Sequence, residues 1–341
     1  MVAIRAFEPL AASAEAWAAY HRFRRIRGGE DDPGEPMPAD ADLERDLCTP
    51  WPLWRSQRFL AWDGAAVVGV LGIGFRREGT ADYADFAPYC TAWGGVVRPW
   101  RRRGVATALL RHLVAFMAEQ GKTRVTIDAR LPEAHGLLTA LGAEPRQVML
   151  RNRLALAGLD LAPLAAWEAA VPAGLTWERH GDRVPLDRLA GLLPQFTALF
   201  RDVPMGSLDV PAMRYELPGY QAWYGEMDRH GGAHLLVLLR QGDAVVAMCE
   251  AAFDARYPDR VHQLLTAVAR DWRGRGLARA VKAAMLRLVR ARLPQAALMV
   301  TMNAEANAPI LALNRRLGFE VQWRNASYQI TREALAARLA G

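Results

Sequence analysis

The 341-residue chain shows the same order of apolar and polar segments twice. In each half, two apolar runs joined by a short polar turn indicate a strand hairpin. A third apolar strand, a glycine-containing turn and a helix with one apolar face follow, and then a strand, a short helix and a last strand. The pattern therefore predicts two α+β units in tandem, each a sheet layered with helices. The hairpins are expected at 58–62 with 67–75 and at 234–240 with 245–253, and the last strands at 147–156 and 322–330.

The boundary between the halves is expected in a stretch of mixed Ala, Leu and Pro without strong strand character. We expect an N-terminal domain at residues 1–156, a linker at 157–174 in which a helical turn is possible, and a C-terminal domain at 175–341.

A short motif, Arg-x-x-Gly-x-Ala, joins the third strand to the amphipathic helix in both halves. Its two copies lie 172 residues apart, since 276 − 104 = 172. Glycine lets a ligand approach the backbone, and the first N–H groups of a helix together with its dipole favour an anion there. Such a turn is suited to a pyrophosphate, with arginines adding charge-assisted hydrogen bonds. The candidate ligands are Val97, Arg101, Arg102, Arg103, Gly104, Val105 and Ala106, and Val268, Arg273, Gly274, Arg275, Gly276, Leu277 and Ala278.

Both motifs and their strand–turn–helix context resemble the GNAT superfamily of N-acetyltransferases (EC 2.3.1.-). The resemblance implies two tandem GNAT folds, each a mixed, mostly antiparallel twisted sheet flanked by helices. It implies that the turn binds the pyrophosphate of acetyl-CoA or another acyl-CoA, and that the pantetheine arm lies in a gap beside the preceding strand. It also implies direct transfer, in a ternary complex, of an acetyl group to a primary amine of a small molecule.

The second half further resembles bacterial tandem acetyltransferases related to mycothiol synthase, in its segment 301–310 and the following Leu317-Gly318-Phe319. That resemblance implies a catalytic C-terminal domain and a degenerate N-terminal one. It also places Asn303 and Asn307 beside the cofactor, together with Asn314. Asparagine before a helix is equally a good N-cap, so capping is the alternative for Asn303 and Asn307.

The residues that would carry the chemistry are less regular. Many family members use a tyrosine four residues before the glycine of the Gly-Phe turn as the acid, but Asn314 and Leu138 stand there. Tyr328 is the substitute we consider, with strand packing as the alternative. Glu250, in an otherwise apolar strand, and His262, before the glycine turn, are candidate bases. Each is equally compatible with an ordinary sheet position.

Acidic and aromatic residues near the start of the second half suit a cationic amine acceptor, or they pack the loop that carries them. They include Asp202, Asp209, Tyr215, Glu216, Tyr220, Trp223, Tyr224 and Glu226. The rival to an enzyme is a non-catalytic acyl-CoA-binding or regulatory protein with two GNAT-like domains, because the usual acid is missing from both halves.

The composition adds few restrictions. The net charge is +7 and the pI about 9.7, but no basic tail or nucleic-acid motif is present, so no nucleic-acid partner is expected. Arginine supplies 43 − 2 = 41 of the basic residues, and Lys122 and Lys282 are the two lysines. The three cysteines show neither a disulfide framework nor zinc spacing, so we expect a cytoplasmic protein without a metal. No membrane segment is expected. We expect a monomer or a homodimer.

Overall fold

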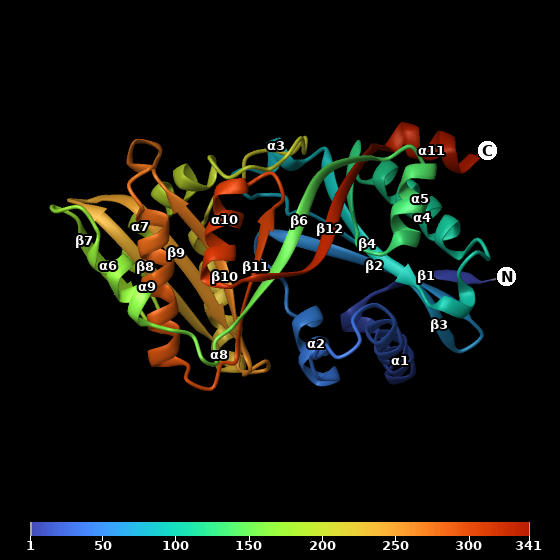
Figure 1. Cartoon of the computed structure of the whole chain (residues 1–341). Helices are drawn as coiled ribbons and strands as arrows, with labels where there is room; N and C mark the ends of the chain where they lie inside the picture. The colour runs from blue at the N-terminus through green and yellow to red at the C-terminus, as the bar shows by residue number, and fades with distance from the viewer. Residues whose placement is uncertain (1, 341) are drawn as a thin grey trace. The chain divides into compact units, whose positions relative to one another are not determined.

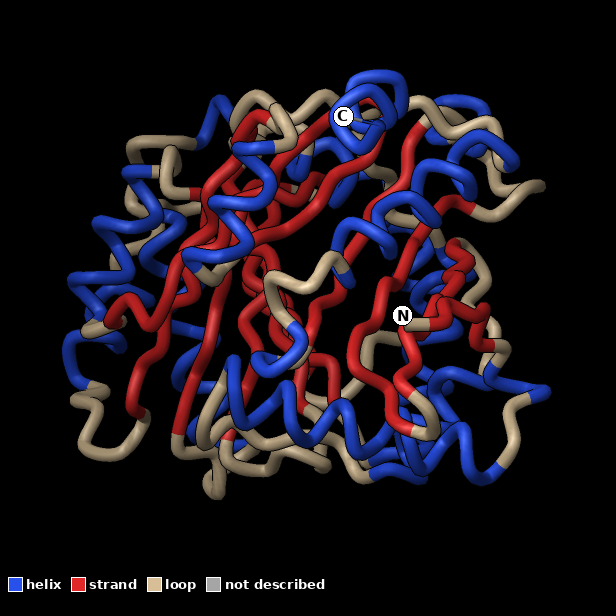
Figure 2. Tube along the Cα trace, turned by 90° about the vertical axis from the view of Figure 1, so that its right-hand side faces the viewer, coloured by secondary structure: helices blue, strands red, loops and turns tan. Residues whose placement is uncertain are grey.

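The computed structural model describes residues 2–340, which form two compact units (Figure 1). The first unit holds the chain up to Arg146, the segment Leu208–Pro211 and the chain from Ala326. The second holds Gln147–Ser207 and Ala212–Asn325. In each unit helices (blue) lie along strands (red), as Figure 2 shows. The predicted α+β class is confirmed.

The first unit has the strand order β1-β2-β3-β4-β5-β12, in which only β4 and β5 run parallel. Its strands are β1 (Ala3–Phe7), β2 (Trp54–Asp63), β3 (Ala66–Arg76), β4 (Tyr89–Val96), β5 (Arg124–Ala129) and the end of β12 (Glu320–Thr331). Its helices are α1 (Ala14–Asp31), α2 (Asp40–Cys48), α3 (Tyr83–Phe86), α4 (Val105–Glu119), α5 (Pro132–Ala140) and α11 (Arg332–Ala340), with 3₁₀ turns at Pro9–Ala11 and Arg98–Trp100.

The second unit repeats this plan in the order β6-β11-β10-β9-β8-β7. Its strands are β6 (Glu144–Ala155), β7 (Thr176–His180), β8 (Ala233–Gln241), β9 (Ala244–Phe253), β10 (Arg260–Val268) and β11 (Leu298–Ala304), and β10 and β11 are its parallel pair. Its helices are α6 (Ala162–Ala169), α7 (Leu186–Phe200), α8 (Leu217–His230), α9 (Leu277–Arg292) and α10 (Ala308–Leu317), with a 3₁₀ turn at Arg270–Trp272.

The apolar pattern explains which faces are covered. Strand β3 is buried along nearly its whole length because α1 and α4 both pack on it. A Cβ on Gly69 of β3 would come within 3.1 Å of Val105 Cγ1, so glycine there allows α4 to lie close to the sheet. In the second unit, α6 and α9 cover one face and α7 and α8 the other. The cluster beneath α6 and α9 includes Leu235, Val237, Cys249, Leu164, Val281 and Met285. The cluster on the other face includes Leu236, Leu238, Met248, Phe196 and Tyr220.

The structure differs in two features from the expectation that each half of the sequence forms its own domain. Strand β6, from the end of the first half of the sequence, pairs antiparallel with β11 of the second unit. Strand β12 pairs antiparallel with β5 of the first unit. The last strands of the two halves are therefore exchanged. The expected linker also contains α6, whose Leu164 is buried in the core of the second unit.

Candidate cofactor and acyl-transfer site

The glycine turn of the second unit ends in a helix N-terminus that no side chain caps. Gly274 and Gly276 have φ values of +78° and +77°, and Gly276 is the N-cap of α9. The first N–H groups of a helix lack partners within it, and no atom lies within 4 Å of a Cβ built on Gly274. The turn therefore has donors and open space for a phosphate group.

The first unit repeats the turn with one change. Gly104 has a φ of +77° and is the uncapped N-terminus of α4. The position that Gly274 occupies is held by Arg102, at a φ of +60°. A left-handed conformation costs a non-glycine residue about 1 kcal/mol, which this turn tolerates. Both copies therefore have two left-handed residues before an uncapped helix start, and phosphate binding at them stays a prediction.

The first arginine of each motif ties the turn to the strand before it. Nε of Arg101 donates to the carbonyl oxygen of Val96 over 3.1 Å, and Nε of Arg273 donates to Val268 over 3.2 Å. Each guanidinium also bonds a carboxylate. Arg101 bonds Glu30 at 3.2 Å and Glu133 at 3.2 Å, and Arg273 bonds Asp202 at 2.8 Å. These contacts assign both arginines to the shape of the turn.

The third position of each motif holds an exposed arginine stacked on tryptophan. The guanidinium carbon of Arg103 lies 5.2 Å from the ring centroid of Trp100, and that of Arg275 lies 4.6 Å from the ring of Trp272. Stacking fixes the plane of the guanidinium, and Nη2 of Arg275 also donates to the carbonyl oxygen of Asp271 over 3.2 Å. Arg103 and Arg275 are therefore the side chains best placed for a phosphate.

A gap between parallel strands leads away from each turn. The pairing of β4 with β5 ends at Ala92↔Ile127, although β4 continues to Val96. The pairing of β10 with β11 ends at Gln263↔Thr301, although β10 continues to Val268. Beyond these rows the facing N–H and C=O groups have no partner in the adjacent parallel strand. An extended chain that contains amides can satisfy such groups.

A β-bulge distinguishes the second gap from the first. The register of β10 with β9 shifts between Gln263 and Thr266, whereas β4 pairs with β3 in continuous register. The offset between the copies is 263 − 92 = 171 before the bulge and 270 − 98 = 172 after it, so one residue is inserted. A bulge leaves a residue outside the ladder and often lies beside an active site.

Asparagines form a buried cluster in the second unit. Oδ1 of Asn303 accepts from Asn314 at 2.7 Å and from Asn152 at 3.3 Å. Asn314 is 1% exposed, and its Oδ1 has no hydrogen-bond partner among the described residues. Asn307 caps α10 by accepting from the N–H of Ile310 at 3.4 Å, so its capping role is confirmed. The sequence contains no signal for Asn152, which the exchanged strand β6 contributes.

The candidate base Glu250 belongs to a buried hydrogen-bonded network. It is 2% exposed, Tyr220 donates to its Oε1 over 2.8 Å, and Nε2 of His234 lies 3.0 Å from the same oxygen. The Tyr224 hydroxyl lies 2.7 Å from Nδ1 of His234. Burial, with Glu250 adding to it, raises the pKa of Tyr220, and burial raises the pKa of Tyr224 to about 12. Both phenols are therefore neutral at physiological pH.

The other candidates are divided between the units. His262 is exposed on β10 and pairs with Ala252 of β9, so it projects from the same face as Glu250, diagonally across the strands. Tyr328, by contrast, lies on the part of β12 that belongs to the first unit. Tyr328 follows the second glycine turn in sequence, but the exchange of the last strands assigns it to the first unit, and its role as an acid stays a prediction.

The predicted acceptor side of the second unit is largely packed. Tyr220 is 7% and Tyr224 6% exposed, and both belong to α8 and are buried in the core that α7 and α8 cover. Asp202 pairs with Arg270 and Arg273 at the turn. These contacts support the packing interpretation for the aromatic residues. Asp209 lies in the first unit, where its backbone N–H donates to Gln329.

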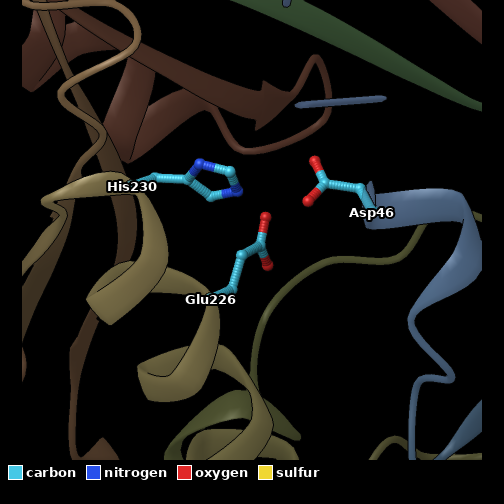
Figure 3. Close-up of side chains that lie close together, drawn as sticks. All are labelled: Asp46, Glu226 and His230. Atoms are coloured by element: carbon cyan, nitrogen blue, oxygen red, sulfur yellow. The ribbon is translucent and has the colours of Figure 1, made fainter. Parts of the chain in front are cut away.

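Glu226 and His230 extend from neighbouring turns of α8 (Figure 3). Arg256 donates to Oε1 of Glu226 over 3.3 Å. Within either unit, residues 2–340 contain no cluster of three His, Cys, Asp or Glu ligand atoms close enough to share a metal ion. Among those residues, no helix combines the length and apolar character required to cross a membrane.

Comparison with known proteins agrees with this geometry. The sequence profile of the Acetyltransferase (GNAT) family matches residues 17–143 and 195–319. No curated protein sequence matches the chain. A tandem GNAT protein from the clavulanic acid biosynthesis pathway, solved without AcCoA, superimposes with a TM-score of 0.74 at 22% identity, over 97% of this chain and 99% of that one. A GCN5-related N-acetyltransferase from Sphaerobacter thermophilus gives a TM-score of 0.65 at 17% identity, over 97% and 96%. The chain belongs to the acetyltransferase (GNAT) family, as a tandem of two GNAT regions that uses an acyl-CoA as co-substrate.

Proposed function

We propose that the protein transfers an acetyl group from acetyl-CoA directly to a primary amine of a small molecule, in a ternary complex. The observation that carries this proposal is the second unit's uncapped turn at Gly276, which leads through an open strand gap to a bulge after Gln263. In the second unit, a candidate phosphate site at the start of α9 is followed by the gap between β10 and β11. The bulge in β10 lies where that gap opens. This arrangement holds an extended thioester at a defined depth.

The residues present fit such a co-substrate. N–H groups at the start of α9 and the guanidinium of Arg275 would hold the pyrophosphate. The orphaned Oδ1 of the buried Asn314 offers an acceptor near the arm. Bound acetyl-CoA would supply an activated acyl group, and the protein's task is to align it with the amine and to remove a proton.

His262 and Glu250 divide the proton-removing role in this proposal. His262 is exposed and is able to contact an ammonium directly. The carboxylate of Glu250 is buried, accepts from Tyr220 and lies beside His234. It therefore assists proton removal indirectly, through Tyr220 and His234, without touching the amine.

Two measurements test the function. Acetyl-CoA at millimolar concentration should raise the Tm, and free CoA should be released with at least one amine of a broad panel. Binding without release from any amine would favour the alternative, an acyl-CoA-binding or regulatory protein, which the missing tyrosine at Asn314 and Leu138 motivates.

Two variants test the proton path. His262→Gln should lower kcat by about 100-fold or more and remove the acidic limb of its pH profile. Glu250→Gln should lower kcat less and shift that limb. His180→Gln, on strand β7 of the same unit, is the matched control and should change neither. An unchanged kcat and pH profile in His262→Gln would exclude it as the base.

A further inference from the structure

The proposed function leaves one partly buried pair in the first unit unused. The hydroxyl of Tyr328, on β12, lies 3.1 Å from Nδ1 of His135, on α5, and their ring centroids are 5.7 Å apart. Tyr328 is 7% exposed and His135 is half-buried. The pair therefore combines a shielded phenol with an imidazole that reaches toward water.

The position of Tyr328 relative to the first gap is set by strand register. Tyr328 pairs with Ile127 of β5, and Ile127 pairs with Ala92 of β4. Ala92↔Ile127 is the last row before β4 and β5 part. Tyr328 thus stands in the row at which the first unit's gap opens.

The second unit has an equivalent row of paired residues where its own gap opens. Its gap opens at Gln263↔Thr301, and Thr301 pairs with Asn152 of the exchanged strand β6. Each exchanged strand therefore places one side chain in the row where the gap opens. In the second unit that side chain is a buried amide, which donates to Asn303. In the first unit it is a phenol, which can give up a proton and recover it.

The helix beside each gap has no proton donor at the matching position. Leu138 of α5 and Asn314 of α10 both stand four residues before the glycine that ends the helix, Gly142 and Gly318. His135 lies one turn before Leu138 on α5 and bonds the phenol instead. In the first unit, the acid that α5 lacks is therefore present on the neighbouring strand.

We propose that the first unit is a second acyl-transfer centre, completed by Tyr328 from the C-terminal strand. This inference rests on the proposed function. The amine nitrogen bonds to the thioester carbonyl carbon, the carbon–sulfur bond breaks, and the sulfur takes the proton of the Tyr328 hydroxyl. The amine gives up one proton to solvent, and the phenolate of Tyr328 recovers one from solvent through His135. His135 is a positioning and relay residue, because it acts on the sulfur only through Tyr328.

The glycine turn of the first unit has the features needed to bind the phosphates of an acyl-CoA. Gly104 begins α4 without a side-chain cap, and Arg103 is exposed and stacked on Trp100. No atom lies within 4 Å of a Cβ built on Gly104, so the cradle is open. The first unit therefore has the phosphate cradle, the gap and an acid in one compact body.

The test separates the two units in the full-length protein. Gly276→Asp places a negative charge at the second cradle and leaves the first intact, and Gly104→Asp does the reverse. Aspartate tolerates a positive φ better than most residues, and its charge suits a helix N-terminus but repels phosphate. Titration calorimetry with acetyl-CoA should show one site lost in each variant. Should either variant lose cooperative unfolding, Arg275→Glu or Arg103→Glu replaces it.

Activity is then measured as CoA release with an amine that the wild type acetylates. In the Gly276→Asp background, Tyr328→Phe should lower kcat by about 100-fold with KM for acetyl-CoA nearly unchanged. In the Gly104→Asp background, Tyr328→Phe should change kcat by no more than about twofold, which is much less than the usual loss when a general acid is removed. Tyr89→Phe, which removes a β4 phenol that bonds Asp209, is the matched control in both backgrounds. His135→Gln should alter the pH profile of kcat in the first background only.

The outcomes distinguish this inference from the function on which it rests. If Gly276→Asp abolishes turnover while Gly104→Asp keeps it, the first unit is not catalytic and only this inference fails. If Tyr328→Phe lowers kcat equally in both backgrounds, Tyr328 is structural and the inference also fails. If the wild type itself releases no CoA with any amine, the proposed function fails, and this inference fails with it.

Discussion

Nζ of Lys282, on α9, donates to Oε1 of Gln263, on β10, over 2.9 Å in the interior of the second unit. Nε2 of Gln263 in turn donates to Oγ1 of Thr266 over 2.6 Å. The residues Gln263 and Thr266 flank the β-bulge at the opening of the gap. One of the chain's two lysines thus supports the irregular strand beside the candidate site, and it is 1% exposed.

This contact predicts a pH-dependent stability. Burial lowers the pKa of Lys282 from 10.5 to about 8. Between pH 8 and 10.5 the unfolded chain binds a proton that the folded chain has released, so the free energy of unfolding rises with pH across that window. The gain is about 3 kcal/mol at most, and below pH 8 the full penalty for burying the charge remains.

Urea denaturation of the wild type and Lys282→Met at pH 7.5, 9 and 10 measures this gain. The wild type should gain stability relative to the variant as the pH rises, because groups common to both proteins cancel in the difference. Lys122, whose pKa burial also lowers, is present in both the wild type and Lys282→Met, so its titration cancels in the difference. A constant difference between wild type and Lys282→Met at all three pH values would contradict the prediction.

The two arginines of the second turn should separate stability from affinity. Arg273 bonds Val268 and Asp202, so Arg273→Ala should lower the free energy of unfolding by about 1–2 kcal/mol. Arg275→Ala should leave the Tm nearly unchanged and raise the Kd for acetyl-CoA by about tenfold, the loss of one charge-assisted hydrogen bond. Thermal unfolding and titration calorimetry report the two quantities. Arg292→Ala, at the opposite end of α9, is the control for affinity. If Arg273→Ala raised the Kd for acetyl-CoA more than Arg275→Ala does, Arg273 would be the phosphate ligand and the prediction would be wrong.

Local pattern was sufficient for the turns and for the helices that follow them. The apolar face of α4, with Val105, Leu109 and Leu113, is buried as its spacing predicts, because a 3.6-residue period depends only on neighbours in sequence. The bulge could not be predicted in this way, because the change of offset between the copies from 171 to 172 is recognised only from the strand register.

Pairing between distant segments could not be predicted in this way. Both last strands mix apolar and polar residues, so their pattern alone does not decide which one lies beside β5 and which beside β11. Their exchange decides that Asn152 joins Asn303 and that Tyr328 joins His135. The site residues that the sequence misplaced or missed are therefore those that the exchanged strands carry.

The strand exchange is itself testable by crosslinking. Thr126 of β5 pairs with Gln329 of β12, and Nε2 of Gln329 donates to Oγ1 of Thr126 over 3.2 Å. The double variant Thr126→Cys/Gln329→Cys, with Cys48→Ser, should form a disulfide under mild oxidation. Contiguous halves would instead bring Arg153 opposite Thr126. Mobility on a non-reducing gel and thiol titration compare this pair with Thr126→Cys/Arg153→Cys, and crosslinking of the second pair alone would refute the exchange.

A last prediction concerns acid stability and rests on Glu178 of β7. Its carboxylate accepts from Arg188 at 2.6 and 2.9 Å, lies 3.0 Å from His180 and accepts from Arg240 at 3.2 Å. The hydrogen bond from Arg188 is the largest influence that lowers the pKa of Glu178, to about 2. The stabilisation is therefore complete above the unfolded pKa of about 4.5 and is lost as the pH falls through about 2.

Glu178→Gln should thus destabilise the protein at pH 6 and progressively less at lower pH. Because water screens this partly shielded carboxylate, we expect a loss of about 1 kcal/mol at pH 6. Urea midpoints at pH 6, 4.5 and 3.5 for the wild type and the variant measure how the difference narrows. Asp243→Asn, which removes an exposed carboxylate that bonds the same Arg240, should show little loss at any pH. A difference between wild type and Glu178→Gln that stays constant down to pH 3.5 would show that the stabilisation does not depend on the ionised carboxylate, and that Arg188 and Arg240 bind the neutral amide equally well.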